Sequence, residues 1–271
     1  MIEPLVSSKW LYDNLNDPDL IVLDASTSSN KAGVKSAFRD QKIPHSRPFN
    51  IKENFSKKDS PFPNTFPLVS QFEEECEKLG ISNSSKIVVY DNLGIYTSPR
   101  VWWMFKTMGH EQVYVLNGGL PDWIANNYET VQKYESFTQR GDFKAHFHSS
   151  SVKDIDFVQS NLVTSSHCLI DVRSKERFLG QVPEPRAGLR SGNIPNSINI
   201  PYTEVLENGK YKPKEELKRV FENAQVDDRP ITFSCGSGIT ACIVLLAAEM
   251  VLTNSVSVYD GSWTEYGTKM K

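Results

Sequence analysis

An internal repeat is the feature of this sequence that most constrains its fold. Three short segments return later in the chain, and each contains either an apolar run or an Ile-Pro turn. The pairs are residues 20–24 with 167–171, 43–46 with 194–197, and 87–91 with 231–235. The separation within a pair varies only from 144 to 151 residues, as loop insertions would cause. We therefore predict that the chain consists of two versions of one structural unit.

Each copy alternates short strands rich in β-branched residues with segments of helical period, such as residues 69–79 and 214–223. This alternation is typical of a parallel sheet flanked by helices, so we predict an α/β fold, formed twice. Residues 129–151 lack sustained periodicity and end in three serines, which indicates a linker. The expected divisions are an N-terminal domain at residues 1–128, a linker at 129–150 and a C-terminal domain at 151–271.

Composition excludes several classes of protein. The 271 residues include 30 Lys and Arg against 33 Asp and Glu, so the formal charge is -3 and the basic excess of a nucleic-acid binder is absent. The longest apolar run, residues 241–248, is far shorter than the roughly 20 residues that span a bilayer. No targeting signal is recognised. We expect no nucleic-acid or membrane partner and a cytoplasmic location, with a mitochondrial location as the alternative.

The four cysteines are too few for a disulfide framework in a chain of this length, and no pair has CxxC spacing. This favours a reducing compartment. Cys168 and Cys242 lie in apolar stretches and are expected in the core. Cys76 lies among glutamates, so we expect its thiol to be half exposed on a helix.

Cys235 stands where a predicted strand turns into a predicted helix. It follows the strand residues 231–234 and precedes Gly236-Ser-Gly-Ile-Thr240, after which an apolar helix is expected. Small residues allow several backbone N–H groups to point at one centre, and the helix adds the positive end of its dipole. Such a loop stabilises an anion, which for a cysteine is its own thiolate. Cys235 is therefore the candidate nucleophile.

Three other interpretations of this loop compete. A buried structural cysteine is the commoner role of an isolated cysteine, but the small-residue loop argues against it. A dinucleotide fingerprint needs further strands of the same sheet, and too few residues follow the acidic candidate Asp260. A cysteine phosphatase needs an arginine at the end of the loop to grip phosphate, and Ala241 and Cys242 stand there instead. The nucleophile interpretation is preferred.

The two copies differ at this position, since the first has Asp91 where the second has Cys235. An aspartate cannot act as a thiol nucleophile, so only the second copy is expected to be catalytic. Upstream of Cys235, Arg177 and Arg186 lie in a predicted loop whose backbone is shaped by Pro and Gly. Either arginine alone is more simply a solvated charge, but two near one thiol loop favour a pair that holds a substrate carboxylate.

These residues, together with their flanking segments, resemble the tandem rhodanese-type sulfurtransferases over almost the whole chain. The segments that carry the resemblance are residues 98–105, 116–123, 184–186, 235–242 and 259–263. Thiosulfate sulfurtransferases of this fold carry basic residues in the loop just after the cysteine. The neutral Gly236-Ser237-Gly238 is more similar to the 3-mercaptopyruvate sulfurtransferases.

The resemblance implies two tandem rhodanese-like domains and a ping-pong reaction. Sulfur passes from 3-mercaptopyruvate to Cys235, which forms a persulfide, and then to a thiol, thioredoxin or cyanide, while pyruvate is released. Catalytic roles are implied for Cys235 and Ser237, without a metal or organic cofactor. The substrate-binding residues implied are Arg177, Arg186, Gly236, Gly238, Ile239 and Thr240. The alternatives are a thiosulfate sulfurtransferase and a non-catalytic persulfide carrier or interaction module.

The sequence departs from the family in its histidines. Family members usually carry a His-Ile-Pro-Gly motif in each copy, but here Lys42 and Asn193 occupy the histidine positions. In the family the first histidine is thought to form a relay with the serine at Ser237 and with an acid, which ungapped counting places near Lys31. Three explanations remain open: Lys42 substitutes in proton transfer, the substrate thiol supplies its own acidity, or the enzyme is slow or prefers another donor.

Overall fold

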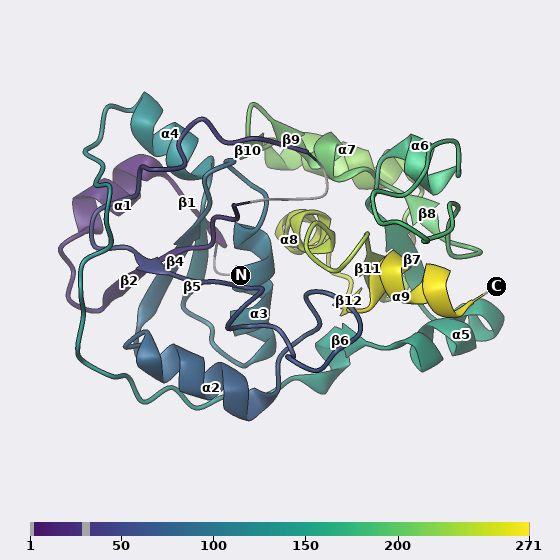
Figure 1. Ribbon diagram of the computed structural model, residues 1–271. Helices are drawn as coiled ribbons and strands as arrows, with labels where there is room; N and C mark the ends of the chain where they lie inside the picture. Colours follow the sequence, from purple (N-terminus) through teal and green to yellow (C-terminus); the bar gives the residue numbers. More distant parts are fainter. Residues whose placement is uncertain (1–2, 29–32, 271) are drawn as a thin grey trace. The chain divides into compact units, whose positions relative to one another are not determined.

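The computed structural model of the chain describes residues 3–28 and 33–270, which form two compact units (Figure 1). Unit 1 contains the chain up to residue 59, residues 66–148 and residues 208–210. Unit 2 contains residues 60–65, residues 149–207 and the chain from residue 211 onward. Each unit therefore includes a short segment from the other half of the sequence.

Unit 1 is built on a five-stranded parallel sheet with the strand order β1-β5-β4-β2-β3. Its strands are β1 (Leu5–Val6), β2 (Leu20–Asp24), β3 (Arg47–Pro48), β4 (Lys86–Tyr90) and β5 (Val113–Leu116). Its helices are α1 (Ser8–Asn14), α2 (Val69–Lys78), α3 (Ser98–Thr107) and α4 (Gly119–Ala125). Strands β2 and β4 are almost wholly buried, as apolar strands of a parallel sheet between helices should be.

Helices cover both faces of this sheet (Figure 1). On one face, Leu11 of α1 and Trp123 of α4 pack with Val22 of strand β2. Phe72 of α2 and Phe105 of α3 form a second apolar layer and meet edge to face, with ring centroids 5.1 Å apart. The alternation of strands and helices in the sequence thus buries apolar side chains in two layers.

Unit 2 repeats this architecture with the strand order β6-β12-β11-β7-β8, again parallel throughout. Its strands are β6 (Val152–Lys153), β7 (Cys168–Asp171), β8 (Ile198–Asn199), β11 (Ile231–Ser234) and β12 (Val256–Tyr259). Its helices are α5 (Ile155–Thr164), α6 (Lys175–Phe178), α7 (Lys214–Asn223), α8 (Ala241–Val251) and α9 (Ser262–Lys269), with short 3-10 turns η1 (Ser149–Ser151) and η2 (Tyr202–Val205). A small hairpin consists of β9 (Leu206–Glu207) and β10 (Lys210–Tyr211). The predicted α/β fold, formed twice, is confirmed.

The segment expected to be a linker packs along unit 1 as far as residue 148. Phe143 is fully buried and meets the ring of Phe72 edge to face at 5.7 Å. The Gly141 N–H donates to the Glu77 carbonyl at 2.9 Å. A Cβ at Gly141 would lie 1.9 Å from the Ile81 carbonyl oxygen, so only glycine allows this close approach.

Two short segments belong to the unit of the other half, and we call them the first arm (residues 60–65) and the second arm (residues 208–210). They occupy equivalent places in the repeat, between β3 and α2 in one copy and between β8 and α7 in the other. In unit 1, Lys210 of the second arm forms an ion pair with Asp122 of α4. A Cβ at Gly94 would lie 2.7 Å from the Gly209 carbonyl oxygen, so the second arm also lies against the loop after β4. No sequence pattern predicted this exchange.

The prediction that Cys76 is half exposed is wrong. Its side chain is fully buried, and burial, with a smaller contribution from the neighbouring glutamates, raises the pKa of its thiol well above the ordinary value. Phe72 and Cys76 are four residues apart on α2 and share its buried face. The position on the helix, rather than the acidic neighbours in sequence, decides the burial. Cys168 and Cys242 are buried as expected.

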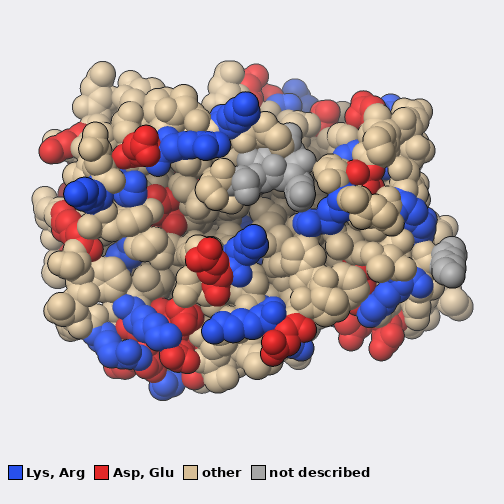
Figure 2. All heavy atoms as spheres, viewed as in Figure 1, with Lys and Arg blue, Asp and Glu red and all other residues tan. Residues whose placement is uncertain are grey.

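Basic and acidic side chains are interspersed over the face shown in Figure 2. This mixture fits the near balance of 30 basic and 33 acidic residues in the sequence. Within residues 3–28 and 33–270, no helix is long and apolar enough to cross a bilayer.

Candidate active site

Cys235 lies directly after the carboxyl end of β11, the central strand of the unit 2 sheet. In open parallel sheets this edge is where ligand sites form. The start of α9 fixes the Cys235 backbone: its N–H donates to Ser262 Oγ at 3.2 Å, and its carbonyl accepts from the Trp263 N–H at 2.9 Å. The residue is 2% exposed. The nucleophile predicted from the sequence therefore has a well-defined position.

The loop after Cys235 directs a backbone donor at the sulfur. The Gly238 N–H donates to Cys235 Sγ, with 3.1 Å between nitrogen and sulfur. Gly238 has a φ of +81°, in the left-handed region that glycine adopts without strain. Helix α8 begins at Ala241 and presents the positive end of its dipole to the same loop. Both features stabilise negative charge on the sulfur.

The remaining loop residues predicted to bind substrate are held from two helices. The carbonyls of Ile239 and Thr240 accept hydrogen bonds from backbone N–H groups in the first turn of α8. The Gly236 carbonyl accepts from both the backbone N–H and the hydroxyl of Thr264 on α9. These bonds set the curvature that brings the Gly238 N–H to the sulfur.

Arg177 flanks this loop from the short helix α6, which sequence analysis had treated as part of a loop. Its Nε and Nη2 donate to the Glu184 carboxylate at 3.2 and 2.6 Å. A Cβ at Gly236 would lie 3.2 Å from Arg177 Nη2, so the guanidinium lies beside the cysteine loop. The Arg177 side chain is 24% exposed and that of Glu184 is 1% exposed. Glu184 therefore holds Arg177 from the buried side.

Glu184 also forms an ion pair on its buried side, as part of a chain of ion pairs that includes Arg173 and Asp171. Arg173 is fully buried, forms a bidentate pair with Asp171, and donates from Nη1 to Glu184 at 2.8 Å. Its guanidinium stacks over the Trp263 ring at 4.5 Å. Two guanidinium and two carboxylate groups thus compensate one another where water is excluded. Sequence analysis missed this role of Glu184, although it lies within the matching segment 184–186.

Arg186 approaches the loop from the other side. Its Nε donates to Thr264 Oγ1 at 3.1 Å, and the Thr264 hydroxyl in turn donates to the Gly236 carbonyl. Burial lowers the pKa of Arg186; the positive charge of Arg177 acts in the same direction, and the charge of Cys235 opposes it. The hydrogen bonds through Thr264 place Arg186 beside the Gly236 end of the loop. The structure therefore brings the two predicted arginines to one thiol loop.

Ser237 is contacted by a residue that sequence analysis did not select. The Nδ2 of Asn64, in the first arm, donates to Ser237 Oγ at 3.1 Å and reaches the Ser237 carbonyl at 3.4 Å. The first arm and the loop both belong to unit 2. The dipeptide Pro63-Asn64 marks a turn in the sequence, but nothing in that pattern identifies its partner.

Lys42 and Asn193, at the positions where the family carries histidines, each donate to a nearby backbone carbonyl. Lys42 Nζ donates to the Gln132 carbonyl at 3.1 Å and lies over the Tyr134 ring. Asn193 Nδ2 donates to the Phe178 carbonyl at 3.0 Å. Lys31, the counted position of the relay acid, lies outside the described residues. The described contacts of Ser237 therefore point to Asn64 rather than to these positions.

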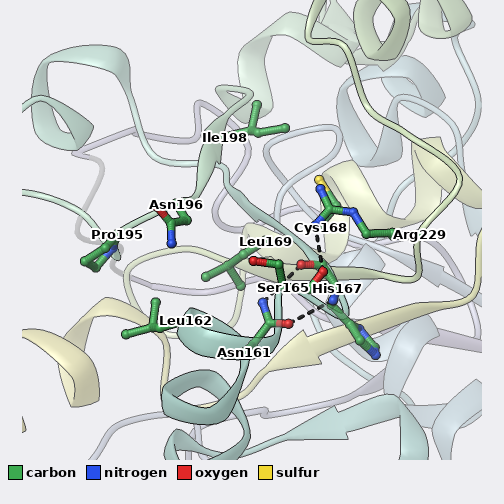
Figure 3. A pocket seen from close by; sticks show the side chains of 10 residues that line it. All are labelled: Asn161, Leu162, Ser165, His167, Cys168, Leu169, Pro195, Asn196, Ile198 and Arg229. Atoms are coloured by element: carbon green, nitrogen blue, oxygen red, sulfur yellow. Dashed lines mark hydrogen bonds between the residues drawn. The ribbon is translucent and has the colours of Figure 1, made fainter.

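A pocket of about 180 Å³ lies at the opposite, amino end of the unit 2 strands (Figure 3). It is lined by Asn161, Leu162, Ser165, His167, Cys168, Leu169, Pro195, Asn196, Ile198 and Arg229. The charge of Arg229 is already paired with Asp227, and its Nη1 donates to the Ser165 carbonyl. The pocket contains none of the residues predicted to act on substrate, so we assign the active site to the Cys235 loop.

The fold and the cysteine loop define a class of proteins. A family model described as a rhodanese-like domain matches residues 7–126 and 155–269, which is most of both units. The chain belongs to the rhodanese-like family and is a tandem-domain sulfurtransferase. The resemblance inferred from the sequence is confirmed.

Individual relatives cover nearly the whole chain. It is 37% identical to the 3-mercaptopyruvate sulfurtransferase of Mus musculus, over 98% of this chain and 92% of that protein. It is 38% identical to the thiosulfate sulfurtransferase of Rattus norvegicus, over 97% of this chain and 91% of that protein. The crystal structure of SseA, a 3-mercaptopyruvate sulfotransferase from Escherichia coli, superposes with a TM-score of 0.84 at 31% identity, covering 96% of this chain and 98% of that one.

Proposed function

We propose that this protein transfers sulfur from 3-mercaptopyruvate to a thiol, a thioredoxin or cyanide through a persulfide on Cys235. The observation that carries the proposal is the 3.1 Å hydrogen bond from the Gly238 N–H to Cys235 Sγ. A thiol held by a backbone donor, in a neutral loop at a helix N-terminus, is prepared to react as a thiolate.

In the first half-reaction the Cys235 thiolate attacks the sulfur of 3-mercaptopyruvate. An S–S bond forms, the C–S bond of the substrate breaks, and its electron pair stays on the methylene carbon as the enolate of pyruvate. The proton of the substrate thiol is transferred to that carbon. The products are the Cys235 persulfide anion and pyruvate, so atoms and charge balance without an external oxidant or reductant.

The two arginines are proposed to bind the substrate carboxylate unequally. Arg177 shares its charge with Glu184, whereas the Nε of Arg186 donates to the neutral hydroxyl of Thr264. An arginine beside a neutral partner retains more of its charge for an anion. We therefore assign Arg186 as the principal carboxylate ligand and Arg177 as the second.

In the second half-reaction an acceptor thiolate attacks the outer sulfur of the persulfide. The S–S bond breaks, the Cys235 thiolate is regenerated, and the acceptor leaves as its own persulfide, or as thiocyanate when cyanide is the acceptor. The backbone donor of Gly238 lies beside Cys235 Sγ in the free enzyme. The same loop is proposed to stabilise the negative charge of the persulfide.

Thiosulfate is the second candidate donor, because a thiosulfate sulfurtransferase is among the similar proteins. The neutral loop Gly236-Ser237-Gly238 favours 3-mercaptopyruvate, since a thiosulfate dianion would gain from basic residues there. The donor preference is therefore part of the proposal and must be measured directly.

The test compares pyruvate release from 3-mercaptopyruvate plus a thiol with thiocyanate formation from thiosulfate plus cyanide. Wild type, Cys235→Ser and the control Cys168→Ala are assayed, because Cys168 lies at the opposite end of the same sheet. We expect turnover that prefers 3-mercaptopyruvate, is lost in Cys235→Ser and persists in Cys168→Ala. Preference for thiosulfate would overturn the donor assignment, and a persulfide that forms without repeated turnover would identify a carrier.

A further inference from the structure

The first arm presents Asn64 to the active-site loop in a locally fixed conformation. Within the arm, Ser60 Oγ and Thr65 Oγ1 are 2.6 Å apart, and Thr65 Oγ1 also contacts the Phe62 carbonyl at 2.9 Å. Lys269 of α9 lies over the Phe62 ring at 5.4 Å. Asn64 has a φ of +60°, a conformation that asparagine adopts more readily than most side chains. The arm therefore positions the amide before any substrate binds.

The orientation of the Asn64 amide follows from its two contacts. Its Nδ2 is 3.4 Å from the Ser237 carbonyl oxygen and 3.1 Å from Ser237 Oγ. A carbonyl oxygen can only accept hydrogen bonds, so the group that faces it must be the NH2. The same NH2 group also donates to Ser237 Oγ, and this hydrogen bond occupies one lone pair of the hydroxyl oxygen. The hydroxyl hydrogen of Ser237 is left to donate in another direction.

We infer that Asn64 is a positioning residue that keeps Ser237 as a hydrogen-bond donor toward the reacting groups at Cys235. The inference rests on the proposed sulfur transfer and deepens it. Ser237 follows Cys235 by two residues in the loop, so its free hydrogen can reach charge that develops on the departing enolate. Because an amide does not titrate, Asn64 cannot accept the serine proton as a base would.

This role selects among the three explanations left open for the missing histidine. Because the Asn64 amide donates to Ser237, it does not take the serine proton. The proton that pyruvate needs then comes from the substrate thiol. Among the described residues, the charged side chains around the loop and arm include Arg177 with its partner Glu184, Arg186, Lys269 with its partner Glu265, and Cys235 itself. Both carboxylates are engaged by a cation, so the amide of Asn64 is the described side-chain partner of the Ser237 hydroxyl.

Two substitutions test the Asn64 hydrogen bond separately from the backbone conformation of residue 64. Asn64→Gly keeps a residue suited to positive φ but removes the amide, and we expect kcat to fall about tenfold, with KM little changed, for the loss of one such bond. Asn64→Asp keeps the shape but replaces the donor by a carboxylate, which accepts the Ser237 hydrogen. At neutral pH we expect a larger loss of about a hundredfold, because the negative charge also opposes the thiolate.

The pH profile is the decisive measurement. As the pH falls, protonation of the introduced carboxylate in the Asn64→Asp enzyme restores a donor, so its kcat relative to wild type should rise, whereas that of Asn64→Gly should stay constant. Asn208→Gly is the matched control, because Asn208 is exposed and has a φ of +50° in the second arm, and it should match wild type. Parallel pH profiles for both Asn64 variants, or an unchanged kcat in either, would overturn the inference. Absence of Cys235-dependent turnover in wild type would instead refute the proposed function.

Discussion

The loop after β4 in unit 1 and the loop after β11 in unit 2 start from equivalent strands but enclose different groups. In unit 1 one carboxylate oxygen of Asp91 accepts from three backbone N–H groups, each at 2.9 Å. The donors are Tyr96, Thr97 and Ser98. The other oxygen accepts from the Leu93 N–H at 3.0 Å. In unit 1 the chain's own carboxylate therefore fills the anion-binding loop.

In unit 2 the equivalent loop surrounds a thiol. The Gly238 N–H is 3.1 Å from Cys235 Sγ, and Gly94 and Gly238 occupy the same place, three residues after Asp91 and Cys235. Both glycines have positive φ, +100° and +81°. A cysteine side chain ends one atom earlier than an aspartate, so a sulfur bonded to Sγ would correspond in position to an Asp91 oxygen. The repeated fold builds a loop of inward-pointing backbone donors twice, and we propose that the residue at the strand end decides whether the loop is structural or reactive.

Giving unit 2 the residue of unit 1 should produce the largest effect. Cys235→Asp removes the sulfur atom that is proposed to carry the transferred sulfur, so we expect turnover with either donor to fall by at least about 1,000-fold. The variant should keep its melting temperature, because the equivalent loop in unit 1 stably holds a carboxylate. Pyruvate release and thermal unfolding check both parts. A variant that fails to fold would break the equivalence of the two loops.

Removing the carboxylate from the unit 1 loop should affect stability rather than chemistry. Asp91→Ala leaves several buried backbone N–H groups without an acceptor, and we expect unit 1 to lose about 3–5 kcal/mol of unfolding free energy. Cys235→Ala in unit 2 should cost much less, since its Sγ accepts one described hydrogen bond from a loop amide. Thermal unfolding of the two variants measures the difference. Equal destabilisation would show that the Asp91 loop is not specially dependent on its anion.

The repeat and the thiol loop could be predicted because they depend on local patterns. Alternating strands and helices specify an α/β unit, and the small residues after Cys235 specify a turn into a helix. The pairing of Arg177 and Arg186 near that loop also followed from the sequence. The thiol loop is encoded within a few neighbouring residues, and the repeat by self-similarity at a nearly constant spacing, whereas the arginine pair was suggested by its Pro- and Gly-rich surroundings and by the family resemblance.

The features that sequence analysis missed depend on tertiary contacts. Asn64 reaches Ser237 only because the first arm packs with unit 2, and no periodicity reports such an exchange. The burial of Cys76 follows from the face of α2 that it shares with Phe72, not from its acidic neighbours. The burial of Arg173 requires both Asp171 and Glu184, which come from different segments. In each case the packing of the folded chain, rather than a local sequence pattern, decides the surroundings of the side chain.

Substitution of the two equivalent glycines, Gly94 and Gly238, should have a smaller effect on the two loops than substitution of Asp91 or Cys235. Gly238→Ala places a Cβ where φ is +81°, and relief of the strain should turn the N–H away from Cys235 Sγ. We expect kcat to fall about tenfold to a hundredfold, as for loss of one preorganised donor. Gly94→Ala would bring a Cβ within 2.7 Å of the Gly209 carbonyl oxygen and should lower stability while leaving kcat per folded molecule unchanged. Steady-state kinetics on folded enzyme distinguish the two outcomes.

The aspartate that ends β2 should give the smallest effect, and the aspartate that ends β7 is its counterpart in unit 2. Asp171 pairs with the buried Arg173, whereas Asp24 accepts hydrogen bonds from the hydroxyls of Tyr90 and Tyr134. Burial without a cationic partner raises the pKa of Asp24, although its hydrogen bonds partly oppose the shift. The folded state then binds the Asp24 proton more tightly than the unfolded state. Stability contributed by the protonated form is complete below the unfolded pKa of about 3.9 and is lost as pH rises through the higher folded pKa.

Asp24→Asn removes this titration. Relative to wild type, the variant should gain stability as the pH rises from 4 to 7, because only wild type must ionise a buried carboxyl over that range. Asp171→Asn is the matched variant in unit 2 and should show no such gain, since it leaves Arg173 without part of its ion pair. Melting temperatures across this pH range test the contrast. A constant difference between wild type and Asp24→Asn would show that the carboxyl of Asp24 keeps one protonation state throughout.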